Sequence, residues 1–301
     1  MRILVSGGSG LVGRDLIATL RCDGHQIVQL VRRRPNPEAP ISEIAWNPER
    51  REIDLRSIGQ IDVAIHLGGV PITGTRWNSK RKLMIYDSRV ESTRLLSQEL
   101  AALEEKPKTL IVASAVGFYG DRGEEPLTEA SSPGKGFLAQ TAVKWESATN
   151  VASEAEIRVV NTRFGLIMSR RGGFLSKVRL PFEIYLGGNL GNGRQWWPWI
   201  SLSDVVNGFS FIIARKDVSG PVNFTAPMPV RNADFSKMMA KTLSRPAWIN
   251  IPAPVIRLLF GKMGDETILH SQRAFPEKLQ AAGFSWLNEE LGDLLNQELT
   301  R

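Results

Sequence analysis

The sequence predicts an α/β protein with a Rossmann-type, doubly wound parallel sheet and a smaller C-terminal portion that covers a substrate. Short, continuously apolar runs alternate with helical patterns over residues 1–165, and this alternation is typical of parallel sheets covered on both faces. A glycine-rich loop follows the first apolar run directly. A chain of 301 residues with 42% hydrophobic residues is long enough to fill such a core.

The first strand–helix–strand unit occupies about 30 residues. Ile3–Ser6 is an apolar run, Leu11 to Leu20 shows helical spacing that ends at Gly24, and Gln26–Val31 is a second apolar run. Three more strands are expected at Ile61–Leu67, Thr109–Ala113 and Ile157–Thr162. Two helices are expected between them, at Ser79–Leu103 and Phe137–Val151.

The alternation stops near Gly165, where the chain becomes irregular and rich in Gly, Pro and Trp. One strand is expected beyond it, at Gly220–Thr225, and three helices, at Asn232–Leu243, Ala253–Phe260 and Leu287–Leu299. We therefore assign residues 1–165 to a nucleotide-binding core, to which parts of 166–230 can return. Residues 166–301 form the substrate-covering portion, with a C-terminal module at about 251–297.

Composition excludes several classes of protein. The 38 Lys and Arg against 31 Asp and Glu give a net charge of +7 without a dense basic block, so we expect no nucleic-acid partner. No apolar run is long enough for a membrane span. Cys22 is the single cysteine, and the three histidines lie far apart, so we expect a cytoplasmic protein without a metal site.

The glycine loop predicts a dinucleotide site. Gly7-Gly8-Ser9-Gly10-Leu11-Val12-Gly13 satisfies the G-x-G-x-x-G spacing between a strand and a helix. Glycines let the backbone approach a pyrophosphate, whose charge is met by the free N–H groups at the start of the helix. We expect the contacts to come from Gly7, Gly10, Leu11, Val12 and Gly13. The alternative is a tight turn that binds nothing.

The second strand ends in Arg32-Arg33-Arg34, where an NAD-specific site usually has an acidic residue. Two guanidinium groups, those of Arg32 and Arg33, suit the 2′-phosphate of NADP(H), because Arg forms bidentate, charge-assisted hydrogen bonds to phosphate oxygens. The alternative is a solvated basic loop. Leu67-Gly68-Gly69 ends the strand at 61–67, and small residues there let a cofactor cross the edge of the sheet, although a plain turn would also explain them.

Several motifs together indicate a family. With the glycine loop, they are Ala113-Ser114-Ala115-Val116-Gly117-Phe118-Tyr119-Gly120, Arg163-Phe164-Gly165, Trp196-Trp197-Pro198-Trp199 and Pro276-Glu277-Lys278-Leu279. On these, the chain resembles the extended short-chain dehydrogenase/reductases over nearly its whole length, and most closely their YfcH-like epimerase-family branch. That resemblance implies NADP(H) and adds Leu67, Gly68, Arg89 and the backbone near Ile167 to the expected cofactor contacts.

The catalytic residues of that family do not match. The superfamily uses a Ser or Thr, a Tyr as general acid/base and a Lys four residues later, but no Tyr-x-x-x-Lys occurs in this chain. Aligned on Lys144, the tyrosine position is Gln140. Aligned on Glu146 instead, the tyrosine and lysine positions are Leu138 and Ala142.

Three side chains remain as catalytic candidates. Ser114 precedes Ala115, which holds the usual hydroxyl position, and either contacts a substrate or caps a turn. Lys144 contacts the ribose or lies on the surface. Tyr119 is a proton donor or packs beside Gly120.

The aromatic loop at 195–199 holds three of the eight tryptophans. Indole rings are suited to grip a ring or an acyl chain, so we expect Trp196 and Trp197 to contact the substrate and Arg194 to meet a phosphate or carboxylate. The alternative is that the indoles anchor the smaller portion on the sheet.

Two functions follow. The first is an NADP(H)-dependent epimerase or oxidoreductase that acts on a small, nucleotide-sugar-like molecule. The second is a catalytically weak or inactive NADP(H)-binding sensor or regulatory protein, linked to cell division or envelope processes as labels in the resembling family suggest. The sequence identifies neither the substrate nor the oligomeric state, and a homodimer is one assembly that it allows.

Overall fold

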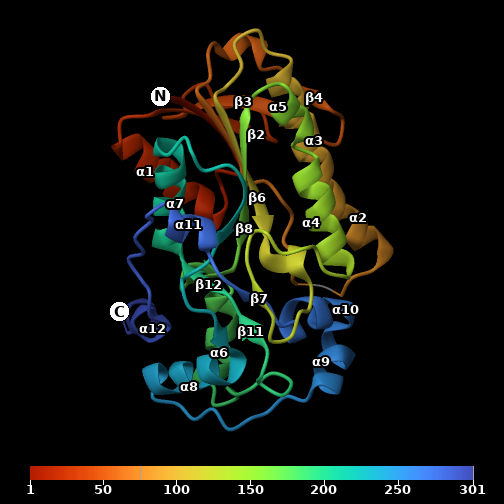
Figure 1. Cartoon of the computed structure of the whole chain (residues 1–301), viewed down its shortest axis with the longest axis vertical. Helices are drawn as coiled ribbons and strands as arrows, with labels where there is room; N and C mark the ends of the chain where they lie inside the picture. Colours follow the sequence, from red (N-terminus) through yellow and green to blue (C-terminus); the bar gives the residue numbers. More distant parts are fainter. Residues whose placement is uncertain (75, 301) are drawn as a thin grey trace.

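The computed structural model describes residues 1–74 and 76–300, and a single large sheet lies at its centre (Figure 1). The sheet has eight strands in the order β13-β8-β6-β5-β1-β2-β3-β4. Every neighbouring pair is parallel except β3 and β4. The strands are β1 (Arg2–Ser6), β2 (Gln26–Val31), β3 (Ser42–Asn47), β4 (Glu52–Ile53), β5 (Val63–His66), β6 (Thr109–Ala115), β8 (Arg158–Phe164) and β13 (Gly220–Phe224). The predicted doubly wound α/β class is confirmed.

Helices cover both faces of this sheet (Figure 1). One face carries α1 (Leu11–Cys22), α7 (Leu202–Ala214) and α11 (Glu277–Ala281), and the other carries α3 (Val90–Ala101), α4 (Phe137–Ser147) and α5 (Asn150–Glu154). Side chains alternate between the faces along each strand. Ile3 and Ile65 therefore join the apolar cluster of α1 and α7, while Leu4 and Ala64 join the cluster of α3 and α4.

Two helices that the sequence predicts as continuous are interrupted. The stretch at 79–103 forms α2 (Ser79–Asp87) and α3, and the stretch at 137–151 forms α4 and α5. At the first break the Ser88 hydroxyl donates to the Ile85 carbonyl and accepts from the Val70 N–H. Side-chain hydrogen bonds of this kind compete with the helical backbone, and the break sets the direction of Arg89.

The second lobe is built from small sheets and short helices, and its largest apolar cluster includes Trp197, Trp199, Phe235 and Leu294. Leu127 of β7 and Ala274 of β15 join a separate cluster with Tyr119 and Ala142. Its strands are β7 (Pro126–Leu127) with β15 (Arg273–Ala274), β9 (Leu166–Ser169) with β10 (Gly172–Gly173) and β12 (Trp199–Ser201), and β11 (Trp196–Trp197) with β14 (Val230–Arg231). Its helices are α6 (Leu175–Glu183), α8 (Asn232–Leu243), α9 (Ala253–Phe260), α10 (Lys262–Gly264) and α12 (Leu291–Leu299), with a π-helical turn, η3 (Asp265–Leu269).

The chain returns from this lobe to the core. β13 adds to the sheet beside β8, and α7 packs on α1. The last helix begins at Leu291 rather than at Leu287, because the backbone N–H groups of Leu287 and Asn288 donate to the buried Asp204 carboxylate. Within the described residues, no helix has both the length and the apolar character needed to cross a bilayer.

Candidate functional site

The glycine loop packs tightly against the neighbouring strand end. Gly7 has φ +75°, and an added Cβ there would lie 2.7 Å from the Leu67 carbonyl carbon. A Cβ on Gly13 would lie 2.4 Å from the Gly7 carbonyl oxygen. Neither position therefore has room for a side chain. The loop connects β1 to α1 and packs against the end of β5.

The amino end of α1 is available to an anion. The helix has 12 residues, its N-cap Gly10 makes no side-chain capping bond, and its first turn contains no acidic residue. Its unpaired N–H groups and dipole favour a bound anion. Val12, Leu67 and Ile167 pack against one apolar cluster, and Leu11 meets the hairpin of β9 and β10. The structure thus brings these expected cofactor residues together.

Arg89 is a cation without an acidic partner at this edge of the sheet. Its guanidinium carbon lies 3.3 Å from the Cβ position of Gly69 and 5.2 Å from the centre of the Trp145 ring. Its Nη1 donates to the Ile85 carbonyl, and no carboxylate in residues 1–74 or 76–300 is recorded as its ion-pair partner. Burial, assisted by the charge of Arg81, lowers the pKa of Arg89 to about 10. A cation in this position favours an anionic ligand.

The two arginines after β2 have different environments. Arg33 forms a bidentate pair with Glu43, with Nη1–Oε2 at 2.8 Å and Nη2–Oε1 at 2.6 Å. This hydrogen bonding lowers the pKa of Glu43. Arg32 is exposed, and the described residues offer it no recorded hydrogen bond or ion pair. Of the two guanidinium groups expected to be available, that of Arg33 is paired with Glu43 and that of Arg32 is not paired within the described residues.

Beneath the site, His66 links three of its segments. Its Nδ1 contacts the Ser6 hydroxyl, and its Nε2 lies 3.0 Å from the Ser92 hydroxyl, which donates to the Ser88 carbonyl. Since Ser92 uses its proton there, it accepts from Nε2–H, and Nδ1 accepts from Ser6. Complete burial lowers the pKa of His66 to about 4, so the ring is neutral near pH 7. The His66 ring thus connects Ser6, at the end of β1 just before the glycine loop, to Ser92 in α3, the helix that follows Arg89.

Ser114 and Tyr119 belong to a buried polar network. Ser114 donates to Glu146 Oε1 at 2.7 Å, and Arg163 holds the same carboxylate through two bonds of 2.8 Å. The Tyr119 hydroxyl donates to Asn223 and accepts from Arg163. Tyr119 has no exposed surface, and burial raises its pKa. The structure gives Tyr119 a packing role, not that of an accessible proton donor.

Lys144 does not face the site. Gln140 and Lys144 are exposed, whereas Ala142 is buried and Leu138 lies beside Gly117. At ~100° per residue, Lys144 is about 160° around the helix from Ala142. This exposure favours the surface alternative for Lys144. Leu138 and Ala142 lie on the inward side of α4, and neither side chain can transfer a proton.

The aromatic loop is mainly structural. Trp197 is buried, with its ring 5.1 Å from Phe174 and 5.5 Å from Phe235. Trp196 lies between the guanidinium groups of Arg231 and Arg273, at 4.4 and 4.9 Å. Arg194 is exposed. These contacts favour the anchoring interpretation.

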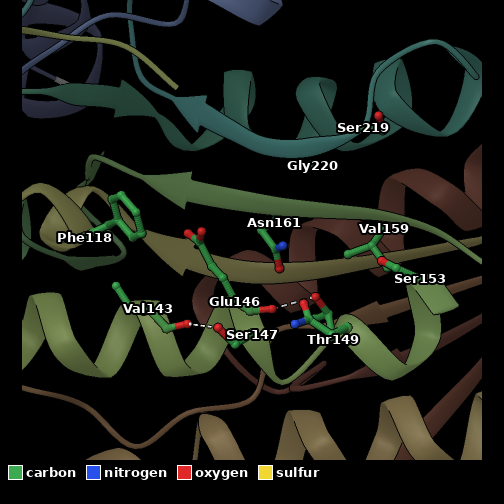
Figure 2. A pocket seen from close by; sticks show the side chains of 11 residues that line it. Phe118, Val143, Glu146, Ser147, Thr149, Ser153, Val159, Asn161, Ser219 and Gly220 are labelled. Carbon is green, nitrogen blue, oxygen red and sulfur yellow. Dashed lines mark hydrogen bonds between the residues drawn. The ribbon is translucent and has the colours of Figure 1, made fainter. Parts of the chain in front are cut away.

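A groove of about 420 Å³ lies elsewhere, between α4, α5 and the outer strands β8 and β13. Figure 2 shows Glu146 extending toward β8, while Ser147 bonds back to the Val143 carbonyl of its own helix. None of the lining residues belongs to the glycine loop or to the Leu67–Gly69 turn. The groove is therefore separate from the candidate cofactor edge.

The sequence interpretation missed Glu266, which ties the C-terminal module to α4. Its carboxylate accepts from the N–H groups of Phe137 at 3.1 Å and of Leu138 at 2.7 Å. Gly136 makes room for it, since a Cβ there would lie 3.0 Å from Oε2. Local spacing gives no signal for a cap that comes from 128 residues away.

Comparisons with known proteins agree with this geometry. Residues 3–224 match the model of the NAD dependent epimerase/dehydratase family, and residues 251–298 match a domain of unknown function, DUF1731. The epimerase family protein Mb2239 of Mycobacterium bovis is 40% identical over 299 residues, which cover 99% of this chain and 98% of that protein.

Two solved structures are similar over the whole chain. Human epimerase family protein SDR39U1, solved with NADPH, has a TM-score of 0.90 and 29% identity, with full coverage of both chains. The nucleoside-diphosphate sugar epimerase from Corynebacterium glutamicum has a TM-score of 0.81 and 35% identity over 99% of this chain. This chain spans 58% of that longer one.

Proposed function

The chain belongs to the NAD dependent epimerase/dehydratase family, and we propose that it binds NADP(H) at the carboxyl edge of β1, β2 and β5 and acts there on a small molecule as an epimerase or oxidoreductase. Ligands of open α/β sheets bind at this edge. The observation that carries the proposal is Arg89, a cation without an acidic partner among the described residues, held against Gly69 beside the glycine loop.

The residues at this edge fit a dinucleotide. The pyrophosphate would lie at the uncapped start of α1, where Gly7 and Gly13 allow close approach. Arg89 would face the anionic middle of the cofactor, and Leu67, Gly68 and Ile167 would line its path. Because His66 holds Ser6 and Ser92 in fixed places, these contacts are largely formed before the ligand arrives.

The preference for NADP(H) rests on Arg32. It is exposed and has no partner recorded in the part of the chain that the structure describes, so its guanidinium is available to a 2′-phosphate. The structure of human SDR39U1 with NADPH supports the same choice of cofactor. Arg33 would contribute only when it leaves Glu43.

The chemistry needs a proton donor other than the family's tyrosine. The nicotinamide, when bound, supplies or accepts the hydride, and the protein orients it and transfers the proton. Leu138 and Ala142 cannot transfer a proton, so this step would fall to another group at the site. The name of the C. glutamicum relative favours a nucleotide-sugar-like substrate.

As one exposed cysteine, Cys22, is the only thiol, we place the protein in the cytoplasm.

A second candidate function is an NADP(H)-binding sensor with little or no turnover. The specific observation that favours it is the pair of apolar side chains, Leu138 and Ala142, at the inward positions of α4. Tight cofactor binding without conversion of any carbonyl or nucleotide-sugar substrate would support it. Product analysis must accompany the absorbance assay, because an epimerase leaves no net change in the reduced nicotinamide.

Titration of NADPH and NADH, followed by nicotinamide fluorescence, tests the proposal. We expect NADPH to bind more tightly than NADH, and Arg32→Ala to weaken NADPH by roughly tenfold to a hundredfold without changing NADH. Arg34→Ala is a matched control in the same loop. Equal affinities of the unmodified protein for the two cofactors would contradict the role of Arg32.

A further inference from the structure

The helix α9 exposes most of its apolar side chains. Leu258 is 73% exposed, Leu259 56%, Val255 40% and Phe260 38%, and Trp248, just before the helix, is 74% exposed. Ile256 is the one buried residue of the helix. We call Trp248, Val255, Leu258, Leu259 and Phe260 the α9 surface. The helix packs on α10 and η3, and its other face presents large apolar side chains that the described residues leave exposed.

The α9 surface continues onto α6. Ile251 donates to the Asn189 carbonyl and accepts from the Gly191 N–H, so the chain before α9 runs beside the chain after α6. Arg245 lies 4.9 Å from the centre of the Tyr185 ring. Figure 1 shows the connection from α8 to α9 running along the end of the molecule opposite the β3–β4 edge. Leu180, Ile184 and Leu186 of this end are also more than half exposed.

The same segment is basic and contains no acid. From Phe235 to Gly264 the sequence has no Asp or Glu, but it has five cations, which are Lys237, Lys241, Arg245, Arg257 and Lys262. Lys237 pairs with Asp234, just before this segment, at 3.4 Å. The two acids that follow are already engaged. Asp265 pairs with Arg257 at 2.6 Å, and Glu266 accepts from the backbone of α4.

We propose that the α9 surface docks the protein on an anionic lipid bilayer. Trp, Leu and Phe side chains partition into the boundary between headgroups and acyl chains, and flanking Lys and Arg bind anionic headgroups. Lys241, Arg245 and Lys262 precede or follow the apolar residues in the sequence. The charge selects an anionic membrane over a second copy of this chain, since two copies would bring their basic segments together. This docking is independent of the cofactor site.

Co-sedimentation of the full-length protein with vesicles tests the proposal. The vesicles contain phosphatidylglycerol with phosphatidylcholine, or phosphatidylcholine alone. We expect sedimentation with the anionic vesicles only, weakened by high salt, because headgroup attraction is screened. The double substitution Leu258→Glu with Leu259→Glu should reduce the bound fraction by about tenfold or more. Fluorescence quenching by brominated lipid should report Trp248 in the wild-type protein and be lost in Trp248→Ala.

Leu287→Glu is the matched control, because Leu287 is 67% exposed but lies outside the α9 surface. It should bind vesicles like the wild-type protein. Thermal unfolding and NADPH titration check that all variants remain folded. Absence of sedimentation with anionic vesicles would overturn the proposal, as would equal binding to both vesicle types. An equal loss of vesicle binding in the Leu287→Glu variant would also overturn the proposal. So would a wild-type protein that does not bind vesicles but forms a dimer, if the Leu258→Glu/Leu259→Glu protein is a monomer.

Discussion

In the proposed site, single residues would determine the preference between NADPH and NADH. Arg32 and Arg33 are neighbours in sequence, but only Arg33 reaches Glu43, which lies on β3 opposite Gln29 in the parallel pairing of β2 and β3. The side chain of Glu43 is 6% exposed, against 61% for Arg33. The carboxylate therefore competes with a 2′-phosphate for one of the two guanidinium groups.

Removing that competition should improve NADPH binding. Glu43→Gln frees Arg33 from an exposed ion pair, which typically contributes ~0–1 kcal/mol, so we expect NADPH to bind up to about fivefold more tightly. NADH, which lacks the 2′-phosphate, should bind unchanged. In the Arg33→Ala background the same substitution should have no effect, and a gain that persisted there would contradict the competition. Fluorescence titration measures all four proteins.

His66 should make the folded state sensitive to acid. Burial lowers its pKa from about 6.5 to about 4, so between these values the unfolded chain binds a proton that the folded chain does not. The contribution of His66 is complete above pH 6.5 and is lost as the pH falls toward 4, by on the order of 3 kcal/mol. Urea unfolding between pH 4 and 8 measures this.

His66→Gln provides the reference, since its carboxamide cannot titrate. Subtracting the pH profile of its unfolding free energy from that of the wild-type protein removes the contribution of the acidic residues that both proteins share. We expect the difference between the two profiles to narrow as the pH falls. A difference that stayed constant between pH 7 and pH 4 would show that His66 titrates equally in the folded and unfolded chains.

The sequence predicts residues of the site when the signal is local. The glycine loop and Arg32 could be assigned because strand, loop and helix follow one another within about 30 residues. Glu43 and Glu266 could not, because a strand pairing and a contact across 128 residues bring them in. The direction in which Lys144 points depends on which face of α4 packs on the sheet. The sequence alone allowed two alignments of α4 with the family's Tyr-x-x-x-Lys motif, one on Lys144 and one on Glu146.

Among the elements, α4 depends on a cap from the C-terminal module. Glu266 accepts two backbone N–H bonds at the start of the helix, and η3, the turn that carries it, is π-helical. Gly136, with φ +110°, leaves the space that the carboxylate fills. The module therefore stabilises the helix whose inward face lies at the candidate site.

Loss of this cap should destabilise the whole fold. We expect Glu266→Ala to lower the free energy of unfolding by about 1–2 kcal/mol, as for other N-terminal caps. Glu289→Ala should be nearly neutral, because Glu289 is exposed and has no recorded bond among the described residues. Chemical denaturation measures both. Equal effects of the two substitutions would mean that the Glu266 contacts contribute nothing.

Hydrophobic periodicity in the sequence did not reveal the break between α2 and α3 or the strand β3. Apolar spacing continues through 79–103, so the pattern predicts one helix, although hydrogen bonds of Ser88 break it. That break turns Arg89 toward Gly69. Strand β3 was missed because it is mostly partly buried or exposed, with Trp46 its buried residue, and a strand of that kind lacks a continuous apolar run.

For the whole molecule, alternation of strands and helices was enough to predict the sheet and its parallel character, and from them follows the edge at which we propose that the cofactor binds. The second lobe was less predictable, since its strands are two to four residues long and, apart from the β9–β10 hairpin, pair across long separations. Because β13 and α7 return to the core after residue 165, no single position in the sequence separates the two lobes.

Calorimetric titration of NADPH into the wild-type protein and Arg89→Met tests the central claim most directly. Arg94→Met is the matched control, because Arg94 lies on the same helix and pairs with Glu91. We predict one NADPH site per chain, weakened by about tenfold to a hundredfold in the Arg89 variant and unchanged in the control. A folded wild-type protein that does not bind NADPH, or an Arg89 variant that binds it equally well, would contradict the account.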